Sequence, residues 1–205
     1  MFCEKYDDLV AVLESRGYTV HHAATPQEAK KEALALLSQG ASVGMGGSMT
    51  VASLGLYDAL VAAGLTVYSH AVVPPAKDPD IFRKENTADW YLCSTNALTR
   101  DGKLVNTDGI GNRVAGMIAG PKNVCLIVGK NKLVKDLSAA LDRVRNVAAP
   151  PNARRLNRNT PCAHTDQCAD CASADRMCRV TSIIEYRPTY LNSLHLILVD
   201  AELGY

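Results

Sequence analysis

The sequence predicts an α/β protein whose core is a Rossmann-like, mainly parallel sheet covered by helices. Three observations support this class: apolar runs of strand length alternate with amphipathic segments, glycines follow several of these runs, and 47% of the 205 residues are hydrophobic. Strands that alternate with helices need crossover connections, which favour parallel pairing. The apolar content suffices for one core, so we expect a single domain over residues 1–205.

The first elements follow from periodicity and helix-capping signals. Residues 4–16 carry a helical apolar stripe, and residues 18–24 form a short strand-like run. The segment 25–40 has the clearest helix signals: Thr25 as N-cap, a proline after it, Glu28 in the capping-box position and a glycine at its end. We therefore expect a helix, a strand and a second helix in this order.

The next segments repeat the alternation. Residues 41–47 predict a strand that runs into glycines, residues 48–64 a helix, and residues 65–69 another strand. The segment 70–87 contains three prolines, which interrupt both helices and strand ladders. We therefore expect a loop there.

The second half continues the pattern with one hairpin. Residues 88–99 predict a strand, and residues 98–106 a hairpin that turns at an Asp-Gly pair. A short helix over 113–120, a strand over 123–129 and an amphipathic helix over 133–146 follow. A pair of prolines shortly after this last helix predicts its end.

The composition excludes several classes of partner. With 22 basic and 21 acidic side chains, the chain has no excess charge that would indicate binding to nucleic acid. No apolar run approaches the roughly 18 residues of a membrane span, and the first residues lack the apolar core of a secretory signal. We expect a cytoplasmic protein, whose seven cysteines are then not a disulfide framework.

A glycine-rich loop follows the second predicted strand. In "GMGGSMT", Gly44, Gly46 and Gly47 allow close approach of the backbone to a phosphate or carboxylate, and Ser48 and Thr50 can donate hydrogen bonds. The alternative is a tight strand-to-helix turn without a ligand. The loop has neither the lysine of a P-loop nor the spacing of a dinucleotide-binding fingerprint.

A second candidate loop is "NTDGIGNR". Asp108, Gly109, Gly111 and Asn112 could bind hydroxyl groups, and Arg113 could bind a carboxylate with its guanidinium fork. The alternative is that Asp108 caps the following helix and Arg113 forms a surface ion pair.

Three polar residues end the apolar strand 123–129. Lys130, Asn131 and Lys132 would lie at the carboxyl end of a central strand, where ligands bind in open α/β sheets. The lysines could neutralise an anionic substrate or a cofactor phosphate. The alternative is a solvated helix start, although lysine is disfavoured near the positive end of a helix.

The string "STNALTRDGKLVNTDGIGNRVAGMIAGPKNVCLIVGKNKLV" resembles the LUD family, the lactate-utilisation domain. The resemblance spans most of residues 1–150 and 180–200, and a subset of the family has a similar cysteine-rich tail. It implies a fold similar to the ribose-phosphate isomerase, glucosamine-phosphate deaminase and CoA-transferase group. It also implies a role in oxidising lactate, or a related acid, to pyruvate, in some members alongside iron-sulfur partner subunits.

The chain departs from the CoA-transferases of that group. These enzymes use a glutamate nucleophile, whereas Asn96 and two hydroxyl residues stand at the end of "WYLCSTN". Covalent acyl transfer is therefore disfavoured. Asp101 and Asp108 are candidate acid/base groups, and Asn96 is a candidate ligand-binding side chain.

Four cysteines are clustered before the last strands. Cys162, Cys168, Cys171 and Cys178 have the spacing C-x5-C-x2-C-x6-C within a loop over residues 157–179. Four thiolates this close can hold a [4Fe-4S] cluster or a zinc ion, and the single CxxC pair is less typical of structural zinc. The remaining alternative is a redox-active or uncoordinated cysteine loop.

Three functions of different class are compatible with these features. The first is a redox or accessory subunit in lactate oxidation that binds a small organic anion and an iron-sulfur cluster. The second is an isomerase or hydrolase for a phosphorylated small molecule, with a structural zinc. The third is a non-catalytic anion-binding scaffold. A homodimer is the default expectation for the assembly.

Overall fold

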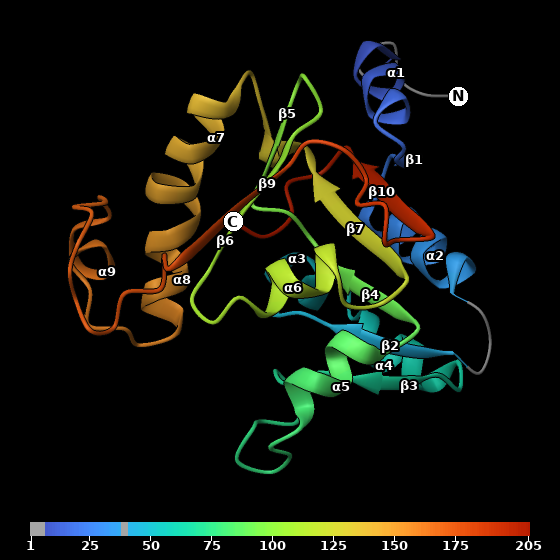
Figure 1. Ribbon diagram of the computed structural model, residues 1–205, viewed down its shortest axis with the longest axis horizontal. Helices are drawn as coiled ribbons and strands as arrows, with labels where there is room; N and C mark the ends of the chain where they lie inside the picture. The colour runs from blue at the N-terminus through green and yellow to red at the C-terminus, as the bar shows by residue number, and fades with distance from the viewer. Residues whose placement is uncertain (1–6, 38–40) are drawn as a thin grey trace.

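The computed structural model describes residues 7–37 and 41–205. Within them, the central sheet has the strand order β1-β10-β7-β4-β2-β3, and every neighbouring pair is parallel (Figure 1). The predicted class, an α/β fold with a Rossmann-like sheet, is confirmed. The strands are Thr19–Ala23 (β1), Ser42–Met45 (β2), Thr66–Tyr68 (β3), Trp90–Cys93 (β4), Asn123–Gly129 (β7) and Ser193–Val199 (β10).

Helices cover both faces of this sheet because its central strands are apolar on both. Along β7, Val124, Leu126 and Val128 pack into one buried cluster, whereas Cys125 and Ile127 pack into another. The first cluster includes side chains of α1 and α6, and the second includes side chains of α2, α3 and α4. These helices are Asp7–Ser15 (α1), Pro26–Leu36 (α2), Met49–Ser53 (α3), Leu56–Ala62 (α4) and Asn112–Ile118 (α6).

A smaller sheet lies beside the first, in the order β8-β5-β6-β9. Its β5–β6 hairpin turns at Asp101 and Gly102, as predicted, and Gly102 has a φ of +83°. A long helix packs against it, with Ala140 and Val144 buried beside the strands. The strands are Ala97–Thr99 (β5), Leu104–Asp108 (β6), Leu133–Val134 (β8) and Val180–Ile184 (β9).

The helix-capping predictions are confirmed where the structure describes them. The Thr25 hydroxyl accepts from the amide of Glu28 at 3.2 Å, and the Glu28 carboxylate accepts from the amide of Ala24 at 2.8 Å. Ser48 likewise caps α3. The predicted stop at the glycine of position 40 lies outside the described residues, as does the predicted start of the first helix at residue 4.

Two predictions in the first half are wrong. The helix expected over 48–64 is two helices, because Gly55 adopts a left-handed φ of +58° between α3 and α4. The loop expected over 70–87 contains the helix α5, Ile81–Thr87. All three prolines of that segment precede α5, so they do not interrupt it.

The strand predicted over 88–99 is also wrong, because its two ends belong to different sheets. β4 stops at Cys93 and β5 starts at Ala97. In between, the Ser94 hydroxyl donates to the carbonyl of Ile127 at 2.6 Å, and the Thr95 hydroxyl donates to the carbonyl of Ala97 at 2.9 Å. Such side-chain bonds to the backbone redirect the chain.

The helix predicted over residues 133–146 begins and ends further along the chain than expected. Asp136 caps it by accepting from the amide of Ala139 at 2.8 Å. The helix is Leu137–Arg143 (α7), continues as a π-helical turn over Val144–Ala148 and ends as Ala149–Arg155 (α8). The wider π turn precedes both prolines, and the helix passes through them rather than ending.

The last helix, α9, spans Pro161–Thr165 and carries the first residue of the cysteine segment. Within the described residues, no helix has the length and apolar character that a membrane crossing requires.

Candidate functional site

The three candidate segments meet at one edge of the central sheet. β2, β4 and β7 are parallel, and β4 is paired with both of the others. Their carboxyl ends therefore share an edge, and each is followed by one of the sequence-predicted segments: the glycine loop after β2, Ser94 to Asn96 after β4, and Lys130 to Lys132 after β7. This is the edge at which open α/β sheets bind ligands.

Lys132 is the most buried cation at this edge, with only 4% of its surface exposed. Its ammonium donates to the hydroxyl of Thr50 and to the hydroxyl of Ser94, each at 2.8 Å. Two of its three N–H groups are therefore bound to neutral oxygens, and the third has no described acceptor. Burial, reinforced by the charge of nearby Arg143, lowers the pKa of Lys132 to about 7.

Arg143 reaches the same edge from α7. Its Nε donates to the carbonyl of Asn131 at 2.9 Å, and its Nη1 to the carbonyl of Asn96 at 2.7 Å. The Asn131 side chain is bonded to the backbone of Leu203 and Gly204, so it fixes the end of the chain over the edge. Burial lowers the pKa of the Arg143 guanidinium.

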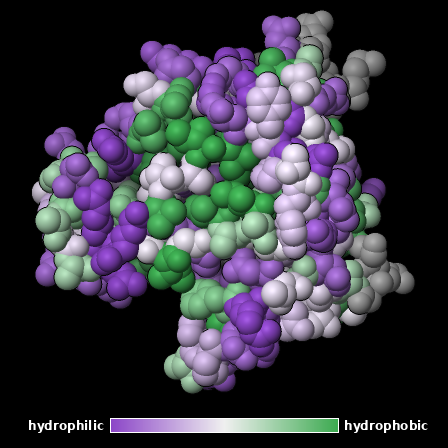
Figure 2. Space-filling view, viewed as in Figure 1, coloured by the Kyte–Doolittle hydropathy of each residue, from purple (hydrophilic) through white to green (hydrophobic). Residues whose placement is uncertain are grey.

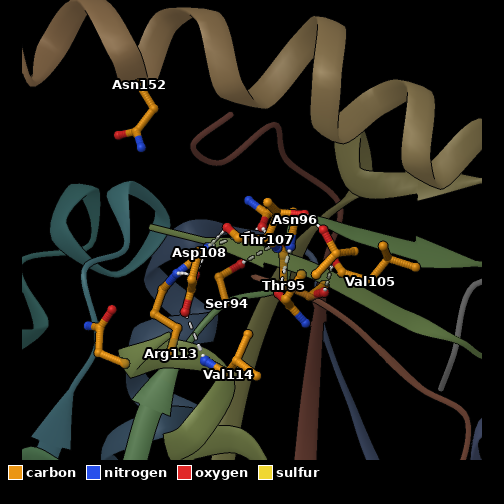
Figure 3. A network of polar contacts seen from close by, with 12 residues as sticks. Ser94, Thr95, Asn96, Val105, Thr107, Asp108, Arg113, Val114 and Asn152 are labelled. Carbon is orange, nitrogen blue, oxygen red and sulfur yellow. Dashed lines mark hydrogen bonds and ion pairs between the residues drawn. The ribbon is translucent and has the colours of Figure 1, made fainter. Parts of the chain in front are cut away.

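Asp108 and Arg113 form a buried ion pair at the end of β6 (Figure 3). The Arg113 Nε donates to the Asp108 carboxylate at 2.7 Å, and its Nη2 donates to Asn96 Oδ1 at 3.1 Å and to the carbonyl of Thr107 at 2.7 Å. Burial opposes the charge on Arg113, but Asp108 and other nearby groups outweigh it and raise the pKa of the guanidinium. Figure 3 also shows Asn152 extending from the long helix toward this network.

The Asp108 carboxylate also accepts from the amide of Val114 at 2.9 Å, so it holds the first turn of α6. The structure therefore shows most of the alternative to ligand binding that the sequence offered for this loop. Asp108 caps the helix, and Arg113 forms an ion pair. The pair is internal rather than on the surface, since the Asp108 side chain is 2% exposed and that of Arg113 15%.

The glycine loop touches this ion pair directly. A Cβ on Gly46 would lie 2.9 Å from Cγ of Arg113 and would overlap the hydroxyl of Tyr91. The Tyr91 hydroxyl donates to the carbonyl of Asn112 at 3.3 Å. Glycine is therefore required at position 46 because two side chains pack against its backbone, independently of any ligand.

Positive charge exceeds negative charge in this network. Arg113 is neutralised by Asp108, whereas no ion pair among the described residues includes Lys132 or Arg143. Both of these cations are at least 94% buried. An uncompensated buried charge is unfavourable, and a bound anion would remove that penalty.

Some predicted site residues lie elsewhere. Asp101 is exposed at the hairpin turn before β6, whereas Asp108 is the last residue of that strand. Hydrogen bonds from Lys103 and Thr99 lower the pKa of Asp101. Lys130 is exposed and Lys132 is buried, so the alternative of a solvated helix start describes Lys130 but not Lys132. Gly111 has a φ of +80° and starts α6. Gly109 lies against the backbone of Met177 in the cysteine segment.

The four clustered cysteines line one cavity beside α8. Its other walls include Arg145, Ala153, Thr160 and Arg176. Burial raises the pKa of the Cys178 thiol, and the nearby thiols of Cys168, Cys162 and Cys171 raise it further. In the part of the chain that the structure describes, no three His, Cys, Asp or Glu side chains converge closely enough to hold a single metal ion.

The cysteine segment is joined to the Asp108 network by main-chain bonds. The amide of Arg179, next to Cys178, donates to the carbonyl of Asp108 at 3.0 Å, and β9 then pairs with β6. Hydrophobic side chains gather on this side of the molecule, between the long helix and the central sheet (Figure 2). Ile110, Val180 and Ile183, in the loop after β6 and in β9, are exposed.

Sequence reasoning missed a histidine–glutamate pair near the glycine loop. The Glu85 side chain is fully buried and accepts from Nδ1 of His70 at 2.7 Å. His70 follows β3, and a Cβ on Gly47 would lie 3.2 Å from its Nε2. Both residues fall in the segment expected to be a loop, and no motif marks their spacing.

A family model described as the LUD domain matches residues 6–199. The chain belongs to the LUD domain family. The expected resemblance is therefore confirmed, and the family is related to lactate-utilisation proteins. Among solved structures, this LUD domain is similar to a DUF162 family protein from Deinococcus radiodurans, with 14% identity, 94% coverage of each chain and a TM-score of 0.53. That similarity supports the fold alone. No curated protein matches the chain.

Proposed function

We propose that this LUD domain binds a small organic acid at the carboxyl edge of β2, β4 and β7, as a redox or accessory subunit in oxidation of lactate, or a related acid, to pyruvate. The observation that carries the proposal is the surplus of buried positive charge. Lys132 and Arg143 are buried, and each is bonded only to neutral oxygens. A small carboxylate would supply the missing negative charge.

The chemistry of the edge suits such a ligand. The ammonium of Lys132 retains one N–H for an acceptor, and the hydroxyls of Thr50 and Ser94 lie within hydrogen-bond distance of the same nitrogen. Arg113 closes the site on the side of Gly46, although its guanidinium is already bonded to Asp108 and Asn96. In this proposal, Lys132 binds the carboxylate and Arg113 is a positioning residue that fixes the loops.

The cysteine segment would hold a [4Fe-4S] cluster. Its four cysteines line one cavity, and the sequence has a single CxxC pair, whereas structural zinc more often uses two. Arg145 and Arg176 are on its wall and would offset the negative charge of four thiolates. When bound, such a cluster takes up and releases single electrons. The short main-chain route from Cys178 to Asp108 would place it near the organic acid.

Calorimetric titration of the purified protein with L-lactate, pyruvate and a sugar phosphate tests the proposal. Binding of lactate or pyruvate is expected. Binding of the sugar phosphate alone would favour the alternative of an isomerase or hydrolase acting on a phosphorylated molecule. The absence of binding by any of the three would contradict the anion site.

A further inference from the structure

His70 and Glu85 form a pair that the proposed function does not use. Glu85 is on α5 and has 0% exposure, whereas the side chain of His70 is 22% exposed. One carboxylate oxygen, Oε1, accepts from the backbone amide of His70 at 2.5 Å and lies 2.7 Å from its ring Nδ1. The other oxygen, Oε2, is buried and has no hydrogen-bond partner among the described residues.

This geometry fixes the tautomer of the histidine. Because Oε1 of the glutamate is an acceptor, Nδ1 carries the proton and the neutral ring has its lone pair on Nε2. The ring is held further by Phe82, with a centroid distance of 4.9 Å.

Nε2 points toward the glycine loop. A Cβ built on Gly47 would lie 3.2 Å from this nitrogen, and no hydrogen-bond partner of Nε2 occurs among the described residues. His70 follows β3 and Gly47 follows β2, and these parallel strands are paired, so both residues are at the same edge as Lys132. A glycine at position 47 leaves the imidazole face open toward the loop.

We infer that the Nε2 of His70 contacts the 2-oxygen of the bound acid and distinguishes a hydroxyl from a ketone. The inference rests on the proposed carboxylate site and deepens it. A neutral Nε2 can accept a hydrogen bond from the hydroxyl of lactate, but it has nothing to offer the carbonyl of pyruvate. Lactate therefore gains one hydrogen bond from His70 that pyruvate does not.

Other charged groups surround the pair. The ion pair of Lys84 with Asp78 lies on the same helix and its preceding turn, while Arg113 of α6 and Tyr91 of β4 pack behind Gly46. Tyr68 of β3 is near Lys84. Lys132 changes charge near neutral pH, but it attracts the carboxylate of both acids equally. The ratio of the two affinities therefore isolates the contribution of His70.

The test is calorimetry with L-lactate and with pyruvate at one pH, on the wild type, His70→Phe and the double variant His70→Phe/Glu85→Gln. His70→Phe should lower the affinity for lactate relative to pyruvate about threefold to tenfold, the size of one hydrogen bond. The double variant removes the buried carboxylate together with its partner and should show the same change. His22→Gln is the control, since His22 also pairs with a carboxylate but lies on β1, at the opposite end of the strand order.

The outcomes separate this inference from the proposed function. A lactate-to-pyruvate affinity ratio that is the same in the wild type and in His22→Gln, and lower in His70→Phe, supports it. Binding of both acids by His70→Phe with the wild-type ratio overturns the role of His70 and leaves the carboxylate site in place. If neither acid binds, both proposals fail. Should His70→Phe not fold because Glu85 is left buried without its partner, the affinity ratio in the double variant decides.

Discussion

A buried lysine without a carboxylate partner is unusual at the scale of a single residue. Lys132 is held by Thr50 and Ser94, and each of these hydroxyls is bonded in turn to a backbone carbonyl. These hydrogen bonds satisfy two N–H groups of the Lys132 ammonium, but they do not neutralise its charge. The protein therefore carries a cost at this residue that a packing role alone does not require, since an apolar side chain could fill the same volume.

Replacing Lys132 with methionine should change how stability depends on pH. The pKa of Lys132 is lowered from 10.5 to about 7 in the folded protein, so between these values the unfolded chain binds a proton that the folded chain does not. The contribution of Lys132 to the free energy of unfolding of the wild type should therefore increase as pH rises from about 7 to about 10.5.

The Lys132→Met variant lacks this gain, so its stability relative to the wild type should be greatest below pH 7 and should decline above it. Urea unfolding at several pH values measures the difference. Lys130→Met is the matched control, because Lys130 is exposed two positions earlier and should follow the wild-type profile. Parallel profiles for all three proteins would show that Lys132 does not carry a perturbed charge.

At the scale of elements, β2 and α5 are packed backbone to backbone. A Cβ on Gly44 would overlap the carbonyl of Glu85, which cannot move without displacing the helix. Gly44→Ala should therefore cost at least about 3 kcal/mol in the free energy of unfolding. Gly47→Ala should cost much less, since its Cβ would meet only the end of the His70 side chain at 3.2 Å. Equal losses in thermal or urea unfolding would contradict this packing.

The elements also show what the sequence could predict. Capping signals at Thr25 and Ser48 and the apolar run of β7 are local, and the structure agrees with them. The switch between sheets after Cys93 depends on carbonyl acceptors such as that of Ile127, 33 positions away, so no local pattern marks it. His70 and Glu85 were missed for the same reason: their contact depends on how α5 packs against β2 and β3.

At the scale of the whole molecule, the cysteine segment and the carboxyl edge are parts of one structure joined through β6 and β9. Cys162, Cys168, Cys171 and Cys178 line the cavity, whereas Cys125 is buried in β7. The first four are candidates for ligands, and the last packs as a small apolar side chain. The two kinds of cysteine should respond differently to the same substitution.

Cys171→Ser should sharply lower the iron content of anaerobically prepared protein, because a hydroxyl is a poor ligand for iron-sulfur chemistry. Cys125→Ser should retain the iron and lose about 1 kcal/mol or more of stability through a buried hydroxyl. Metal analysis and absorbance near ~400 nm, where iron-sulfur clusters absorb, measure the first effect. Wild-type protein that holds zinc instead would favour the structural-zinc alternative, and protein with neither metal would refute the four-cysteine site.

The affinity for pyruvate, measured by calorimetry at pH 6 and pH 9 in the wild type, Lys132→Met and Lys130→Met, tests the central claim most directly. A charge-assisted hydrogen bond from Lys132 is worth about 1.5–3 kcal/mol, so Lys132→Met should weaken binding at pH 6 by about tenfold or more. The wild type should bind more weakly at pH 9, where Lys132 is neutral, and Lys130→Met should behave like the wild type. Equal affinities of the wild type and Lys132→Met at pH 6 would contradict an organic-acid site built on this buried lysine.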